Sequence, residues 1–203
     1  MRLCILLISL AQLLPGTLPA QQQGGRWALV LSFARESFRG ASSDTSSIPG
    51  TTVEVYPSSR LSTELGLGRR IGTWDVTVSA GYASGDLRAK TDLLVLDDRT
   101  TSVKRYRGAL LLSRRLAGFR ESSLLLVGGP VVDHWTTTGL GDRTTLGGRV
   151  GVALRVPLGR LELENRALFG IGASPFNRRD LPPEAKIESL RSWSLGVALR
   201  LRL

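Results

Sequence analysis

The chain has 203 residues, enough for one domain of ordinary size, and it carries 27 basic residues against 17 acidic ones, a net charge of +10. So high a positive charge raises nucleic acid as a partner. The arginines are dispersed along the chain rather than clustered, and the amino terminus has the pattern of an export signal. We therefore expect no nucleic-acid partner.

The first twenty residues predict a signal peptide. Arg2 precedes a short apolar run, which ends near Leu18, Pro19 and Ala20, residues typical of a cleavage site. The run is well below the ~20 residues that a membrane helix needs. We expect a signal peptide over 1–20, which is removed, and one mature domain over 21–203; the alternative is a short anchor helix. Cys4 is the only cysteine, so the mature domain would contain no disulfide.

From residue 26 onward, apolar and polar residues alternate in eight segments, the period of a β-strand with two unlike faces. The expected strands cover residues 26–38, 52–68, 72–83, 103–116, 121–135, 144–158, 161–173 and 187–203. Proline cannot donate to a β-ladder, so we expect a bulge around Pro130, or a position for it above the bilayer.

The connections between these segments alternate in length. Short turns are expected at 69–71, 117–118 and 159–160, whereas the polar connections 40–50, 84–101, 136–143 and 174–186 are long. Short turns at one end and long loops at the other are typical of bacterial outer-membrane barrels. The predicted fold is all-β, an eight-stranded antiparallel up-and-down transmembrane β-barrel.

The composition of the polar face decides which face meets lipid, because a soluble barrel would show the same alternation. This face is rich in small residues and carries charges of both signs, as expected of a narrow lumen in which charges must pair. The lumen ion-pair candidates are Glu64, Asp75, Arg107, Arg149, Arg155, Glu162, Glu164, Arg166 and Arg200. They predict a plug that fills the barrel; the alternative is a narrow pore or gate. Glycines expected on the same face, making room for charged side chains, are Gly66, Gly68, Gly81, Gly108, Gly151, Gly170, Gly172 and Gly196.

Aromatic residues lie near the ends of the predicted strands on the aliphatic face, the distribution that two membrane interfaces favour. Trp27 and Trp74 belong to the short-turn end, and Tyr56, Tyr82, Tyr106 and Trp135 to the long-loop end. The alternative is that they are core residues of a soluble barrel. The long loops are nearly neutral, while the short turns carry six arginines against Glu121. This excess of positive charge on the short turns is consistent with contact between their arginines and phosphates of the inner leaflet.

The chain resembles the small eight-stranded outer-membrane barrels of the OmpA-barrel, OmpX and OmpW type. The resemblance covers residues 26–203 and rests on the strand pattern, on LLLVGGP at 124–130 and on LGVALRLRL at 195–203. It departs from the family at Leu203, where the last residue is usually aromatic. The resemblance implies a place in the outer membrane, contact with the bilayer and with lipopolysaccharide, insertion by the barrel-assembly machinery, and a monomer.

Residues suited to catalysis are few. His134 is the only histidine and follows Asp133, and an Asp–His pair can belong to a hydrolase. Lipid A deacylases are eight-stranded barrels in which His, Ser and Asn lie close together near the rim. Thr136, Thr137 and Thr138 follow instead of that family's His-x-Ser-Asn pattern. We expect no cofactor and no metal centre, although Asp92, Asp97 and Asp98 could contact divalent cations or lipopolysaccharide. Three functions remain: a non-enzymatic barrel with a structural or loop-mediated role, a narrow channel for small hydrophobic molecules, and a lipid A-modifying enzyme.

Overall fold

The computed structural model describes residues 27–44, 53–58, 60–91, 94–181 and 185–203. The predicted signal peptide at 1–20 lies outside these residues, as do parts of three of the four long connections. Within the described ranges, no helix is long and apolar enough to cross a membrane.

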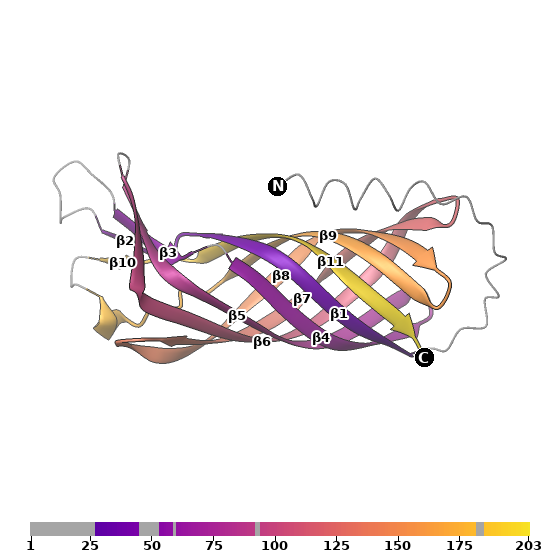
Figure 1. Cartoon of the computed structure of the whole chain (residues 1–203), viewed down its shortest axis with the longest axis horizontal. Coiled ribbons are helices and arrows are strands. Elements are labelled where there is room, and N and C mark those ends of the chain that lie inside the picture. The colour runs from indigo at the N-terminus through magenta and orange to yellow at the C-terminus, as the bar shows by residue number, and fades with distance from the viewer. Residues whose placement is uncertain (1–26, 45–52, 59, 92–93, 182–184) are drawn as a thin grey trace.

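The described residues form a closed antiparallel barrel of eight long strands (Figure 1). Each strand pairs with its neighbour in the chain, and β1 pairs with β11 to close the cylinder. This is the predicted up-and-down topology. The barrel strands are β1 Trp27–Arg39, β4 Arg60–Ile71, β5 Trp74–Lys90, β6 Val95–Phe119, β7 Ser122–Thr137, β8 Leu140–Leu158, β9 Leu161–Gly172 and β11 Leu190–Arg202.

Three short strands extend the barrel at its long-loop end. They are β2 Ser42–Asp44, β3 Val53–Pro57 and β10 Lys186–Ile187, and a 3-10 turn, η1, covers Arg178–Asp180. β3 pairs with the outer part of β5, β2 with β3, and β10 with β2. The chain therefore builds a small sheet beyond the barrel wall.

The prediction that residues 84–101 form one long loop is wrong. β5 continues to Lys90 and β6 begins at Val95, so most of this segment is a β-hairpin that projects beyond the barrel. The pairing shifts between Asp86 and Leu87, where β6 inserts extra residues. The carboxylate of Asp98 accepts hydrogen bonds from the hydroxyls of Thr100 and Thr101 at this shift. The hairpin bends sharply toward its tip (Figure 1).

Two of the three predicted turns lie two or more residues further along the chain. β4 and β5 are joined by Gly72 and Thr73, and β6 and β7 by Arg120 and Glu121. Gly72 has a φ of 61° and Arg120 a φ of 52°, the left-handed conformation that tight hairpins demand. The third turn, Gly159–Arg160, is where the sequence predicts it. Arginine pairs before the first two turns thus remain within the strands.

The outward face of the barrel is apolar, as the strand alternation predicts. On β11, the side chains of Trp193, Leu195, Val197, Leu199 and Leu201 all point outward and are 38–69% exposed. The expected bulge at Pro130 is absent, because this residue stays in register with Gly148 on β8. On its other side, β7 has no ladder pairs opposite Leu110 and Leu111 of β6, and the pairing resumes beyond them in the same register. Gly108 also departs from expectation, since it lies on the outward face beside Tyr106 and Leu110.

Candidate functional site

Six charged side chains from five strands meet inside the barrel toward its long-loop end. We call them the loop-end cluster: Glu36, Glu64, Arg105, Arg107, Asp133 and Arg149, all of them buried. Glu36 on β1 is the centre, because Arg105 and Arg107 approach its two carboxylate oxygens at 2.6 and 2.9 Å, and Arg149 also donates to it. Arg107 makes a two-point contact with Asp133, at 2.6 and 2.9 Å. Arg149 reaches across the lumen to Glu64 at 2.9 Å.

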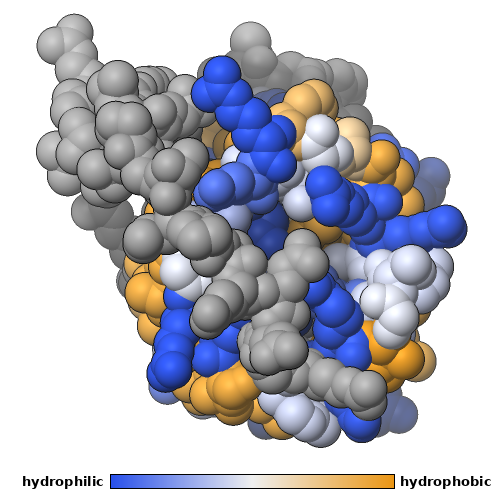
Figure 2. Space-filling model, turned by 90° about the vertical axis from the view of Figure 1, so that its right-hand side faces the viewer, coloured by the Kyte–Doolittle hydropathy of each residue, from blue (hydrophilic) through white to orange (hydrophobic). Residues whose placement is uncertain are grey.

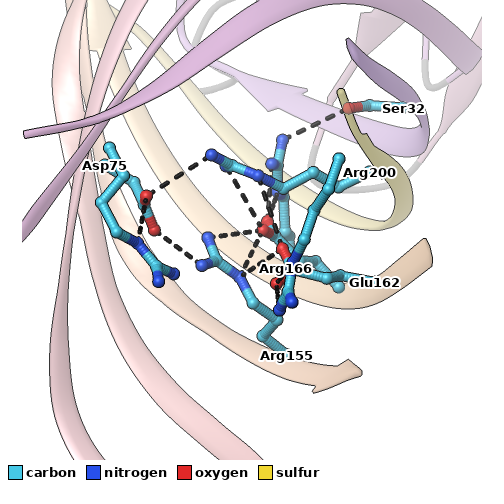
Figure 3. A network of polar contacts seen from close by, with 9 residues as sticks. Ser32, Asp75, Arg155, Glu162, Arg166 and Arg200 are labelled. Atoms are coloured by element: carbon cyan, nitrogen blue, oxygen red, sulfur yellow. Dashed lines mark hydrogen bonds and ion pairs between the residues drawn. The ribbon is translucent and has the colours of Figure 1, made fainter. Parts of the chain in front are cut away.

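A second group lies toward the short turns, and we call it the turn-end cluster: Asp75, Arg155, Glu162, Glu164, Arg166 and Arg200 (Figure 3). Arg155 bridges Asp75 at 2.6 Å and Glu164 at 2.8 Å. Arg200, on the final strand, lies 3.4 Å from Asp75 and 3.4 Å from Glu162. Arg166 contacts Glu164 at 2.6 Å and donates to the Ser32 hydroxyl at 3.2 Å. Arg202 and Arg70 add contacts at the mouth of the lumen.

Each cluster is electrically balanced. The loop-end cluster joins three carboxylates to three guanidinium groups, and so does the turn-end cluster. A buried ion without a partner costs several kcal/mol, so a narrow lumen that holds many charges must neutralise them locally. Glycines leave the room for this packing: a Cβ on Gly81 would lie 2.5 Å from Glu64 Cγ, and one on Gly68 would lie 2.9 Å from Arg200 Nη2.

A cluster of buried apolar side chains, which we call the apolar cap, lies next to the loop-end cluster on its long-loop side. Its buried members are Phe38, Ala41, Tyr56, Leu87, Val103, Trp135, Phe176 and Leu190. Trp135 packs against Phe38 in an edge-to-face contact with ring centroids 6.0 Å apart. The guanidinium of Arg105 lies 5.3 Å from both of these rings, so the cap is stacked directly on the ion pairs.

The predicted role of Trp135 at the membrane interface is therefore wrong. Only 2% of the residue is exposed, and its indole N–H donates to the hydroxyl of Thr145 inside the barrel. Trp135 shares the inward face of β7 with Val131 and Asp133, a face that the irregular apolar run at 124–127 obscures in the sequence. Tyr56 is likewise part of the cap. Trp27, Trp74, Tyr82 and Tyr106 do point outward, and the rings of Tyr82 and Tyr106 contact each other at 5.3 Å.

Between the two clusters, one side of the lumen is apolar. This wall consists of Ala109, Leu111, Leu125, Val127, Val131, Ala153 and Leu168. A cavity of about 20 Å³ lies beside Ser32, Ser62 and Ser194, and another of about 20 Å³ lies below the cap. Each has room for about one water molecule.

The structure brings all nine predicted ion-pair residues into the lumen and adds others that the sequence reasoning missed. Glu36 is the most important, and its position was readable, because it continues the inward alternation of Ala28, Val30 and Ser32. Arg105 shares the polar face of β6 with Arg107. Asp133 adjoins His134 in the sequence, which suggests hydrolase chemistry rather than a lumen ion pair.

His134 and Asp133 do not form a pair. Asp133 points inward to Arg107, whereas His134 points outward, with its Nδ1 3.0 Å from the Thr144 hydroxyl. Adjacent residues of a strand lie on opposite faces, so the wall of the barrel separates these two side chains. Among the described residues, no group of three His, Cys, Asp or Glu side chains has the arrangement of a metal site.

Comparison with solved structures identifies the fold. The chain is similar to Neisserial surface protein A, with 13% identity and a TM-score of 0.58 over 90% of this chain and 100% of that one. It is also similar to OprG from Pseudomonas aeruginosa (15% identity, TM-score 0.48, covering 89% and 98%) and to Ail of Yersinia pestis (12% identity, TM-score 0.41, covering 88% and 100%). No protein-family model and no curated protein matches the chain.

A closed antiparallel barrel with an apolar outer face and a charged lumen defines a transmembrane β-barrel. More narrowly, the chain has the fold of the small eight-stranded outer-membrane barrels.

Proposed function

We propose that this chain is a non-enzymatic outer-membrane barrel with a closed lumen, and that its role is structural or is carried out by its long-loop end. The observation that supports the proposal most directly is the stacking of two neutral ion clusters and an apolar cap along one narrow lumen. We further propose that the barrel follows a signal peptide at 1–20, inserts through the barrel-assembly machinery, contacts lipopolysaccharide and is a monomer.

The proposed closure of the lumen rests on the free energy that opening it would cost. An eight-stranded barrel leaves an interior only wide enough for side chains. A solute that passed through would have to displace guanidinium groups held between carboxylates, such as Arg107 between Glu36 and Asp133. Removing one partner from a buried ion pair costs about 3–5 kcal/mol, and several such contacts would have to open together.

The long-loop end offers the surface for an interaction role. The β5–β6 hairpin and the short strands β2, β3 and β10 build a folded platform beyond the barrel wall. The apolar cap lies beneath this platform, since Tyr56 of β3 and Leu87 of β5 belong to it. A platform fixed to the barrel in this way presents a defined surface at lower entropic cost than a free loop.

Planar-bilayer recording of the purified, folded protein tests the closed lumen. We expect no steady single-channel steps, because water and ions would have to separate the buried ion pairs to pass. Steady steps that disappear on heat denaturation would overturn the proposal and favour the narrow channel. Uptake of small hydrophobic molecules into vesicles containing the protein, above the rate of protein-free vesicles, would overturn it in favour of a transporter.

A further inference from the structure

Two tryptophan–arginine pairs stand on the outward face at the short-turn end. Trp27 on β1 lies directly opposite Arg69 on β4, with the guanidinium carbon 5.0 Å from the ring centre. Trp74 on β5 lies directly opposite Arg114 on β6, at 5.4 Å. The strands β1, β4, β5 and β6 are consecutive in the barrel wall, and Ile71 lies opposite Trp74 between the two pairs. We call these five residues the turn-end strip.

The arginines of the strip differ from those of the lumen. Every arginine of the two ion clusters contacts a carboxylate, and Arg70, next to Arg69, reaches Asp75 at 3.3 Å. Arg69 and Arg114 are exposed, and among the described residues neither has an acidic partner. Their charged ends therefore lie at the rim of the apolar belt, fixed by a tryptophan ring and open to the membrane.

We propose that the turn-end strip binds the phosphate of an anionic phospholipid in the leaflet on the short-turn side, which is the periplasmic leaflet of such barrels. A guanidinium group donates two parallel hydrogen bonds to phosphate oxygens, and an aromatic ring beneath it holds it in one orientation. Tryptophan favours the depth of lipid headgroups, so the pairs lie where phosphates lie. Ile71 and the exposed faces of Trp27 and Trp74 would contact the glycerol and the first acyl carbons.

The surrounding charge favours a lipid with net negative charge. Figure 2 looks onto the short-turn end and shows hydrophilic side chains across it, with apolar ones around its sides. Arg115, Arg120 and Arg160 are exposed at this end against Glu121 alone among the turn residues. A zwitterionic lipid supplies its own ammonium group to its phosphate, whereas phosphatidylglycerol does not, so phosphatidylglycerol should be preferred.

Quenching of tryptophan fluorescence by brominated lipids tests the strip. The test uses a variant with Trp193→Phe, in which Trp27 and Trp74 are the remaining tryptophans that face lipid. This variant is placed in vesicles that contain either brominated phosphatidylglycerol or brominated phosphatidylcholine. We expect half-maximal quenching at a lower mole fraction of phosphatidylglycerol. The double variant with Arg69→Gln and Arg114→Gln should abolish this selectivity, because removing each arginine should weaken the preference for phosphatidylglycerol roughly fivefold.

A variant with Arg120→Gln and Arg160→Gln is the matched control, because it removes the same charge from turn residues that no tryptophan contacts. It should keep most of the selectivity. Equal loss in both variants would overturn the proposal in favour of general attraction to an anionic surface, and absence of selectivity in the parent protein would also overturn it. Heat-modifiable gel mobility verifies that each variant is folded, and the bilayer recording above reports on the lumen independently.

Discussion

Glu36 shows how one residue organises the lumen. It accepts contacts from Arg105, Arg107 and Arg149, which belong to β6 and β8, while it lies itself on β1. These strands are far apart in the chain and are brought together only by closure of the barrel. The Glu36 contacts therefore connect the barrel wall across its diameter, whereas the ladder hydrogen bonds connect it only around its circumference.

Replacing Glu36 with glutamine should destabilise the barrel strongly. The change keeps the size of the side chain but leaves the loop-end cluster with an uncompensated positive charge. We expect the free energy of unfolding to fall by about 3–5 kcal/mol, measured by urea titration of the protein in lipid vesicles. Glu121→Gln, at the exposed β6–β7 turn, removes the same charge and should change this free energy by about 0.5 kcal/mol or less. Similar losses in both variants would refute the central role of Glu36.

Trp135 gives a second test at the same scale. Trp135→Ala should cost about 3–5 kcal/mol, since it removes a buried ring from the apolar cap and from the face of Arg105. Trp193→Ala, at a residue that is 62% exposed on the outward face, should cost less, because lipid fills the vacated space. The same urea titration compares them. A larger loss for Trp193 would mean that Trp135 does not support the cap.

At the scale of elements, alternation of residue types predicted most of the fold. It placed eight strands and the lipid-facing side of β11, because each follows from the period of two within one segment. Turn positions were less accurate: Arg69 and Arg70 look like turn residues yet belong to β4, and Ala117 and Gly118 look like a turn yet belong to β6. The contacts of Glu36 and the burial of Trp135 depend on strands far apart in sequence, so no local pattern revealed them.

The bend of the β5–β6 hairpin should depend on Asp98. The hydroxyl of Thr100 and then that of Thr101 donate to its carboxylate, which lowers the pKa of Asp98 from its usual 3.8 to about 2. The charged form therefore stabilises the bend above about pH 4, and this contribution is lost as the pH falls through about 2. Asp98→Ala should raise the hydrogen-exchange rate of the Thr100 amide several-fold at neutral pH, because that amide also donates to the carboxylate. An unchanged rate would show that the strands alone hold the bend.

For the whole molecule, closure of the lumen should be redundant. The turn-end cluster, the loop-end cluster and the apolar cap follow one another along a single axis, so each is a barrier in series with the others. Asp75→Ser with Arg155→Ser removes one acid and one base, which keeps the turn-end cluster neutral while it opens space there. We expect this variant to fold, by heat-modifiable mobility, and to remain silent in planar bilayers, because water that enters from the short-turn side still meets Arg107, Arg149 and the cap. Steady channel steps from this variant would show instead that the turn-end cluster alone keeps the barrel closed.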